Sequence, residues 1–396
     1  MPRRAKGAAN AARLRVCFVT GTRAEFGLMR TTLSAIRAHP QLQLQIVCTG
    51  MHLDPAHGRS IDAIRADGWE VDAVVPWQKR GRCNGVCPAA NAAATGHAMA
   101  GLAEAYERLG SDVVLVVGDR VEAFAAAAAA QVAHRFLAHV HGGDRAMGQV
   151  DDSLRHAITK LANLHFAATA GAAERIRRLG EDPRTVHRVG SPGIDGIRGL
   201  AACSRELRRE FPGLKPGRFA LLLLHPTGPA EPSERRRAEM VFDAVRESGV
   251  EQTVIVYPNN DPGAAGIIRC WEKLRPSNDL FIRRDVPRSE FLGLLRDAAV
   301  LVGNSSSGII EAATFGTRVV DVGPRQAGRE RGPNVTNVPF EREAILRAVR
   351  DVWNSGRPLR DTSGNVYGGG GAGARIARIL ARLSAGARAP GKLIAY

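Results

Sequence analysis

Short apolar runs that end in glycine or a polar residue alternate with helix-like segments along almost the whole chain. LRVCFVT (Leu14 to Thr20) is the first run, DVVLVVG (Asp112 to Gly118) is a later one, and the alternation starts again at FALLLLHP (Phe219 to Pro226). Continuous apolar runs of this length are typical of strands buried on both faces of a parallel sheet, where helices make the crossovers. Repeated βα units in both halves predict an α/β protein with two doubly wound domains that face each other across a cleft.

A stretch with several prolines divides the two sets of βα units, and 396 residues are too many for one ordinary core. We expect an N-terminal domain over residues 1–190 and a linker or hinge over residues 191–217. The second domain would cover residues 218–372. Residues 373–396 would form a last helix and a tail that pack back on the N-terminal domain.

The composition excludes several classes of protein. Hydrophobic residues make up 44% of the chain and charged residues 24%, as in soluble globular proteins, and no apolar run is long enough to cross a bilayer. Met1 to Arg15 is basic and lacks the apolar core of a secretory signal, so we expect a cytoplasmic protein that does not contact membranes. The formal charge of +16 is mostly arginine spread along the chain, and aromatic residues are only 5%. With so few stacking platforms, we expect an anionic small molecule as partner and no nucleic acid.

The six cysteines are scattered, several of them within strand-like runs, so a disulfide framework is not expected. Cys83 and Cys87 are four residues apart, but no second pair completes a zinc site. A structural loop is therefore preferred to a metal or redox role for this pair.

Charged and polar side chains follow two predicted strands and open the next helix between Val116 and Lys160. The carboxyl ends of parallel strands meet at one edge of a sheet, so these side chains are expected to share a site. Such a group suits proton chemistry on an anionic substrate. Its members are Asp119, Arg120, His141, Asp144 and Asp151.

Simpler interpretations of these residues stay open at this point. Asp119 and Arg120 could be a capped helix start with a surface ion pair, and Asp151 and Asp152 could serve the helix dipole. His139, His141 and Asp144 together resemble a metal set. His52, His156 and His165 are interpreted as packing or hydrogen-bonding residues rather than bases.

Each half also contains a turn suited to an anion. In the first half, a strand passes through Gly21, Thr22 and Arg23 into a helix, whose first N–H groups are expected to point at a ligand. In the second half, GNSSSG (Gly303 to Gly308) follows a buried strand and opens a helix. Serine and asparagine are also ordinary N-caps. The glycines do not match the dinucleotide fingerprint, so NAD is not inferred.

Many short motifs, in one order from about Leu14 to Leu383, make this chain resemble the UDP-hydrolysing UDP-N-acetylglucosamine 2-epimerases of the sialic-acid pathway type. They are GTRAEFG, TGMHL, GDRVEAFA, HVHGGD, DDSLRHAITKLANLHF, VGSPGID, HP, YPNNDPG, GNSSSGIIEA and GPRQAGRERGPNV. The resemblance implies the GT-B fold, with two Rossmann-like domains and a nucleotide sugar between them, in a homodimer or homotetramer. It also implies a reaction without metal or other cofactor: UDP leaves C1 as the C2 proton is removed, and water adds to the resulting glycal to give the free 2-epimer.

The site residues implied by the resemblance fall in both halves. Asp119, His141, Asp144 and Asp151 match catalytic positions, and Asp144 stands where a glutamate is usual. A transition state with positive charge at C1 and a weakly acidic C2–H both call for carboxylates. The positions that match substrate-binding residues for UDP-sugar and UDP are Arg23, Arg120, His225, Asn259, Ser305, Ser306, Glu311 and Arg325.

Three other functions remain as alternatives. The same chemistry could act on UDP-N,N′-diacetylbacillosamine in legionaminic-acid synthesis. A GT-B glycosyltransferase would need an acceptor, and a nucleotide-sugar sensor would bind without turnover.

Overall fold

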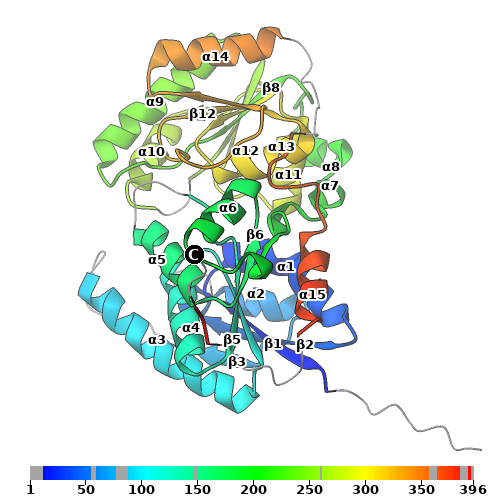
Figure 1. Cartoon of the computed structure of the whole chain (residues 1–396). Coiled ribbons are helices and arrows are strands. Elements are labelled where there is room, and N and C mark those ends of the chain that lie inside the picture. The colour runs from blue at the N-terminus through cyan, green and yellow to red at the C-terminus, as the bar shows by residue number, and fades with distance from the viewer. Residues whose placement is uncertain are drawn as a thin grey trace, which may run out of the picture. The chain divides into compact units, whose positions relative to one another are not determined.

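The computed structural model describes residues 12–54, 59–76, 88–145, 150–258, 261–355, 364–383 and 391–393, without the side chains of residues 88–91, 150 and 151. Cys83, Cys87 and Asn259 lie outside the described residues, and so does the side chain of Asp151. The chain divides into two compact units, which Figure 1 shows as separate sheets with their own helices. The first unit consists of Met1–Asp144, Gln149–Pro192 and Gly371–Tyr396, and the second of Arg145–Gly148 and Gly193–Gly370.

Seven parallel strands form the sheet of the first unit, in the order β3-β2-β1-β4-β5-β6-β7. The strands are β1 (Leu14–Thr20), β2 (Leu42–Thr49), β3 (Ala73–Val75), β4 (Val113–Val117), β5 (Phe136–Val140), β6 (Leu164–Ala167) and β7 (Val186–Arg188). The helices are α1 (Arg23–Ala38), α2 (Ser60–Ala66), α3 (Pro88–Leu109), α4 (Val121–Val132), α5 (Val150–Leu161), α6 (Ala170–Arg178) and α15 (Ala372–Leu380).

The central strands of this sheet are buried on both faces. In β1, Val16 and Phe18 belong to one apolar cluster, and Cys17 and Val19 to another. Side chains of a strand alternate between its faces, so the two clusters lie on opposite sides of the sheet. Helices α1, α2 and α15 contribute to the first cluster, and α3, α4 and α5 to the second. Helices on both faces confirm the prediction of a doubly wound unit.

Six parallel strands form the sheet of the second unit, in the order β10-β9-β8-β11-β12-β13. The strands are β8 (Phe219–Leu223), β9 (Gln252–Val256), β10 (Leu280–Arg283), β11 (Val300–Gly303), β12 (Arg318–Val322) and β13 (Val335–Val338). The helices are α7 (Ile197–Leu200), α8 (Ser204–Glu210), α9 (Glu231–Glu247), α10 (Ala264–Trp271), α11 (Arg288–Asp297), α12 (Ser306–Ile310), α13 (Ala312–Phe315) and α14 (Arg342–Asn354).

Several details of the second unit differ from the sequence-based expectation. Strand β13 was not predicted, because it lies at the edge of the sheet and two of its four residues, Thr336 and Asn337, are exposed and polar. The helix that GNSSSG was expected to open is divided into α12 and α13 at Glu311. The expected linker over residues 191–217 contains α7 and α8, which belong to this unit. From Phe219 onwards the alternation of strand and helix is otherwise as predicted, which confirms a second doubly wound unit.

Both sheets reverse their strand order at one point, between β1 and β4 in the first and between β8 and β11 in the second. In open α/β sheets, ligands bind beyond the carboxyl ends of the strands at such a switch point. Gly21 and Asp119 follow β1 and β4, and His225 and Asn304 follow β8 and β11. The candidate residues therefore lie beside the two switch points.

The chain returns to the first unit after the second is complete. Ile376, Ala377 and Leu380 of α15 are buried in the cluster that α1 also lines. Further along, Lys392 places its ammonium against the end of α5, where it donates to the carbonyl oxygens of Thr159 (3.1 Å), Lys160 (2.6 Å) and Ala162 (2.6 Å). The ammonium therefore caps the carboxyl end of α5, beside the Ala162 N–H, which also donates to the Thr159 carbonyl oxygen (3.3 Å).

Lys392 also takes part in a buried ionic network around Glu181. The Glu181 carboxylate lies 2.5 Å from Lys392 Nζ, 2.7 Å from Lys160 Nζ and 3.1 Å from His165 Nε2. Burial by itself raises the pKa of Glu181, but the hydrogen bonds from these three partners outweigh it and lower the pKa from 4.5 to about 2.

We expect Glu181→Gln to remove an acid-dependent part of the stability. The pKa of Glu181 is lower in the folded state, so its contribution is present above about pH 4.5 and is lost as the pH falls toward 2. The variant should be less stable at pH 7 by about 2–3 kcal/mol, and the difference should vanish near pH 2. Free energies of unfolding in urea between pH 2 and 7 test this. Glu174→Gln, at an exposed ion pair with Arg178, is the control and should change little.

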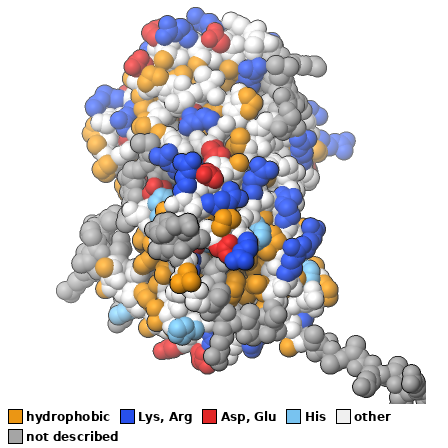
Figure 2. All heavy atoms as spheres, in the orientation of Figure 1, with side chains coloured by type: hydrophobic (Ala, Val, Ile, Leu, Met, Phe, Trp, Pro, Cys, Tyr) orange, Lys and Arg blue, Asp and Glu red, His pale blue; other side chains and the backbone are white. Residues whose placement is uncertain are grey.

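Positive and negative side chains lie among one another on the face drawn in Figure 2. Figure 2 shows Lys and Arg side chains spread over the visible face, with acidic side chains among them. Within the described ranges, no helix combines the length and the apolar character that crossing a membrane requires.

Candidate active site

Arg155, on α5, joins the acidic residues at the edge of the first sheet. The guanidinium is buried, with 3% of the side chain exposed, and forms an ion pair with Asp119 after β4. Its Nη1 donates to the Asp152 carboxylate (2.6 Å) and to the carbonyl oxygen of Asp144 (2.9 Å). One planar side chain with several donors thus fixes a strand end, a loop and the first turn of a helix relative to one another.

His141, directly after β5, has a protein partner at each ring nitrogen. Nδ1 lies 2.8 Å from Oδ2 of Asp144, and Nε2 lies 3.0 Å from the hydroxyl oxygen of Ser191. The loop between His141 and Asp144 requires glycine at position 143, because φ is +74° there and a Cβ would come within 2.3 Å of the carbonyl oxygen of Ala172.

The ring of His139 is also engaged by the protein. Its Nε2 lies 2.8 Å from the carbonyl oxygen of Gly118, and its Nδ1 lies 3.3 Å from the Thr159 hydroxyl. Burial lowers the pKa of His139 to about 3, so the ring is neutral at pH 7. Because both nitrogens have partners, the geometry does not favour the alternative in which His139, His141 and Asp144 bind a metal.

The turn after β1 differs from the expected anion site, because a carboxylate of the protein uses its N–H groups. Glu25 accepts hydrogen bonds from the N–H groups of Gly21 (2.7 Å) and Thr22 (3.0 Å), and its own N–H donates to the Thr22 hydroxyl (3.3 Å). This is a capping box. Burial, and next the charge of Glu122, raise the pKa of Glu25 to about 7. Arg23, at the start of α1, is exposed.

Glu122 lies against the same turn. A Cβ on Gly21 would come within 2.6 Å of the Glu122 side chain, and one on Gly50 within 2.8 Å, so both positions need glycine for this carboxylate to fit. Arg120 places its Nε 3.2 Å from Glu122, whose side chain is almost fully buried, while Arg120 itself is 44% exposed. Arg120 is therefore held by an acid on one side and faces solvent on the other.

His225, after β8, is fixed in the second unit by Asn304, after β11. The Asn304 amide accepts from the His225 N–H (2.7 Å) and donates to the His225 carbonyl oxygen (2.9 Å). In turn, the Asn304 carbonyl oxygen accepts from Arg325 (3.2 Å) and Gln326 (2.9 Å). Burial, and next the charge of Arg325, lower the pKa of His225 to about 3. The imidazole is neutral at pH 7.

The serine turn follows β11 in a conformation that only glycine allows. Gly303 has φ +142°, and a Cβ there would lie 2.0 Å from the carbonyl oxygen of Leu223. Ser305 caps α12, because its hydroxyl accepts from the Ser307 N–H (3.3 Å), and Ser306 is the first residue of the helix.

Glu311, at the other end of α12, is buried and forms an ion pair with Arg288.

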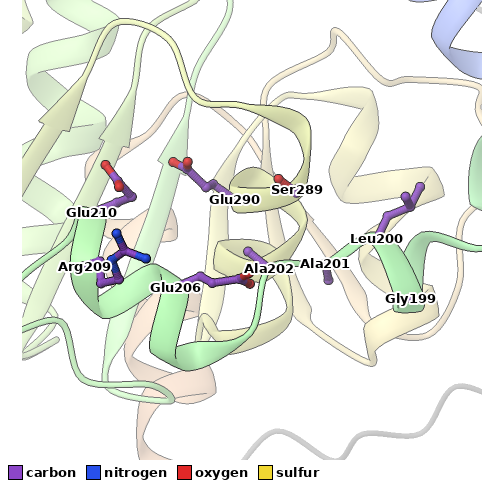
Figure 3. A pocket seen from close by; sticks show the side chains of 9 residues that line it. All are labelled: Gly199, Leu200, Ala201, Ala202, Glu206, Arg209, Glu210, Ser289 and Glu290. Carbon is purple, nitrogen blue, oxygen red and sulfur yellow. The ribbon is translucent and has the colours of Figure 1, made fainter. Parts of the chain in front are cut away.

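A further hollow in the second unit is separate from these residues. It has a volume of about 390 Å³ and lies between α7, α8 and the start of α11, where Glu206, Arg209, Glu210 and Glu290 line it (Figure 3). None of the residues predicted for the site lines it. Acidic side chains alone do not identify a ligand, and we assign this hollow no function.

The comparison with known proteins decides the family. The sequence profile described as UDP-N-acetylglucosamine 2-epimerase matches residues 34–381. The chain belongs to this family.

Two curated proteins align with nearly the whole of this 2-epimerase-family chain. The hydrolysing UDP-N,N′-diacetylbacillosamine 2-epimerase of Legionella pneumophila is 36% identical over 367 residues, which cover 92% of this chain and 95% of that protein. The UDP-N-acetylglucosamine 2-epimerase of Neisseria meningitidis is 32% identical over 352 residues, which cover 89% and 90%.

Solved structures support the fold. The crystal structure of UDP-GlcNAc 2-epimerase from Neisseria meningitidis bound to UDP-GlcNAc superposes with a TM-score of 0.78 at 17% identity, covering 93% of this chain and 100% of that one. A 2-epimerase structure from Listeria monocytogenes gives 0.75 at 20% identity. The predicted GT-B fold class is confirmed.

Several residues in this epimerase-family site were not predicted to be site residues. Arg155 and Ser191 hold predicted catalytic residues, and Glu25 and Glu122 lie under the first turn. Of these four, only Arg155 could be inferred from spacing, because it follows Asp152 by three positions on a helix and so lies on the same face.

Proposed function

We propose that this protein is a hydrolysing UDP-sugar 2-epimerase, most simply one that acts on UDP-N-acetylglucosamine. UDP would leave C1 as the C2 proton is removed, and hydration of the 2-acetamidoglucal would give N-acetylmannosamine. Membership of the family over nearly the whole chain, together with a cluster of Asp, His and Arg beside the switch point of the first sheet, with its Arg and His buried and its carboxylates partly exposed, supports this function.

The first unit would carry out the chemistry. Asp119, Asp144 and Asp151, with His141 as a partner in proton transfer, would handle the C2 proton, the positive charge that develops at C1, and hydration. Arg23 and Arg120 would bind the diphosphate, and Arg120 is held for this by its ion pair with Glu122.

The second unit would bind the nucleotide. Ser305, Ser306 and the neutral ring of His225 suit the phosphates. Arg325 supplies a positive charge, and its hydrogen bond to the Asn304 carbonyl oxygen holds the guanidinium in place.

Glu311, which is buried at the end of α12, suits the ribose hydroxyls. Asn259 stays a prediction from the sequence, because it lies outside the described residues.

A second substrate is favoured by a specific observation. The Legionella relative is named as acting on UDP-N,N′-diacetylbacillosamine and is 36% identical to this chain. The same residues would then act on a sugar with a second acetamido group. A homodimer or homotetramer and a cytoplasmic location remain predictions.

We expect UDP release when the protein is incubated with the correct UDP-sugar alone, in D2O and with chelator. UDP-N-acetylglucosamine and UDP-N,N′-diacetylbacillosamine are compared side by side, with UDP measured by anion exchange and the sugar by NMR. A free 2-epimer with deuterium at C2 supports the proposal. An epimerised sugar still attached to UDP would show that the enzyme is not hydrolysing. Absence of any reaction with both sugars would favour the glycosyltransferase or the sensor.

A further inference from the structure

Asp144, His141 and Ser191 form one hydrogen-bonded array. The contacts are 2.8 Å from Asp144 Oδ2 to His141 Nδ1 and 3.0 Å from His141 Nε2 to Ser191 Oγ. The side chain of Asp144 is 20% exposed, that of His141 8%, and Ser191 is fully buried. The array therefore runs from a buried hydroxyl to an accessible carboxylate.

The buried end of this array is firmly anchored. Val189, two residues before Ser191, donates its N–H to the carbonyl oxygen of Ala167 (3.0 Å) and accepts from the Arg375 guanidinium (2.6 and 2.9 Å). The next residue, Pro192, accepts from the Thr31 hydroxyl (3.4 Å). Ser191 therefore lies between two fixed backbone positions.

The backbone of His141 is held in an uncommon conformation. Its φ is +64°, in the left-handed region that a residue with a Cβ seldom adopts, at a cost of about 1 kcal/mol. Its N–H donates to the carbonyl oxygen of Phe166 (3.1 Å), and its ring contacts Asp144 and Ser191. Such a conformation persists where the surroundings hold it, and it occurs often at functional sites.

With the Asp144 carboxylate ionised and the His141 ring neutral, the donors and acceptors of the array fit one tautomer. An ionised carboxylate only accepts hydrogen bonds, so Nδ1 of His141 carries the proton that is donated to Asp144. In the neutral ring, Nε2 is then an acceptor, and the Ser191 hydroxyl donates to it. Oδ2 of Asp144 accepts this bond, and the bond thereby orients Oδ1, the oxygen proposed to exchange a proton with a substrate.

We propose that Ser191 is a positioning residue of this active site, which fixes the ring of His141 and thereby the orientation of the Asp144 carboxylate. Asp144 lies in a loop outside the helices and strands, so its orientation depends on such a partner. The inference rests on the proposed hydrolysing epimerase function, and it assigns to Ser191 a role in turnover rather than in substrate affinity.

Ser191→Ala tests the proposal with the sugar that the wild-type protein turns over. We expect kcat to fall about tenfold and KM to stay within twofold, because the hydroxyl acts on the reacting carboxylate through His141. Thr159→Val is the matched control, since it removes another buried hydroxyl, 3.3 Å from the neighbouring His139. The two variants should lose similar thermal stability, and the control should keep its kcat. An unchanged kcat in Ser191→Ala, or an equal loss in the control, overturns the proposal.

A double-mutant cycle separates action through Asp144 from any other effect. In an Asp144→Asn background, Ser191→Ala should change kcat by less than twofold, because the group that it positions has already been removed. If the two losses multiply instead, Ser191 acts by another route and the proposal is wrong.

NMR of 15N-histidine-labelled protein gives a readout independent of turnover. Signals of His141 are assigned by their loss in His141→Gln. We expect the Nδ1–H tautomer in the wild type and, in Ser191→Ala, a shift of the Nε2 signal to that of a nitrogen without a hydrogen bond. A different tautomer in the wild type, or an Nε2 signal that does not move in Ser191→Ala, overturns the inference whatever the activity.

Absence of UDP release from the wild-type protein would instead overturn the proposed function. The NMR result would still show whether Ser191 donates to the ring of His141.

Discussion

Asp119→Asn is expected to lower the rate of UDP release about a thousandfold or more, while the affinity for UDP changes less than threefold. The amide has nearly the shape of the carboxylate, but it can neither take up a proton nor stabilise positive charge at C1. Steady-state kinetics of UDP release and calorimetric titration with UDP measure the two effects. Binding should persist because the residue proposed to bind the ribose, Glu311, belongs to the other compact unit.

The control for this prediction is Asp182→Asn, which removes a carboxylate paired with exposed Arg184. It should keep wild-type kinetics. Wild-type turnover in Asp119→Asn would show that the carboxylate takes no part in the reaction, and it would remove the central residue of the proposed mechanism.

Arg155→Met is expected to cost both stability and activity. It leaves Asp119 and Asp152 without the guanidinium that joins them, and removing one partner of a buried ionic group costs about 3–5 kcal/mol. Thermal unfolding should begin roughly 10 °C lower, because each kcal/mol corresponds to about 2–4 °C in a domain of this size. UDP release should be lost even at temperatures where the variant is folded, as circular dichroism can verify.

Arg155→Lys distinguishes charge from geometry in the same site. The ammonium keeps the charge, but it cannot reproduce the planar fork that contacts Asp119 and Asp152 together, so we expect intermediate stability and activity at least tenfold below wild type. Arg178→Met, at an exposed pair with Glu174 on α6, is the matched control and should cost less than about 0.5 kcal/mol. Full activity in Arg155→Met would contradict the role given to this arginine.

Apolar runs predicted the architecture well wherever burial was strong. Strand β1 begins and ends at Leu14 and Thr20, as the sequence indicates, because every residue of the run except Arg15 is buried. Strands at the edge of a sheet are harder to predict from apolar runs. Strand β13 pairs on one side only, and its exposed Thr336 and Asn337 interrupt the apolar pattern.

The candidate site could be predicted only in part, because its supporting contacts join distant segments. Position and residue type identified His141 and Asp144, but Ser191 lies 50 positions further along the chain, and only the pairing of β5, β6 and β7 brings it to the imidazole. At the turn after β1, in contrast, the sequence pattern predicts a ligand site that the protein fills with its own side chain. The sequence indicates an anion site there, and the structure shows that the helix supplies the carboxylate itself, through Glu25.

The return of the chain at α15 has a consequence for how this protein is synthesised. The ribosome has to add Gly193–Gly370, most of the second unit, between Pro192 and the helix that covers α1. Until α15 is synthesised, the apolar face of α1 and the first sheet that contacts Ile376 and Leu380 stays exposed. The end of α5 gains its contact with Lys392 only after that. A nascent chain released at residue 192 would therefore contain all seven strands of the first sheet and the proposed catalytic residues, but it would lack α15 and so expose an apolar, aggregation-prone face.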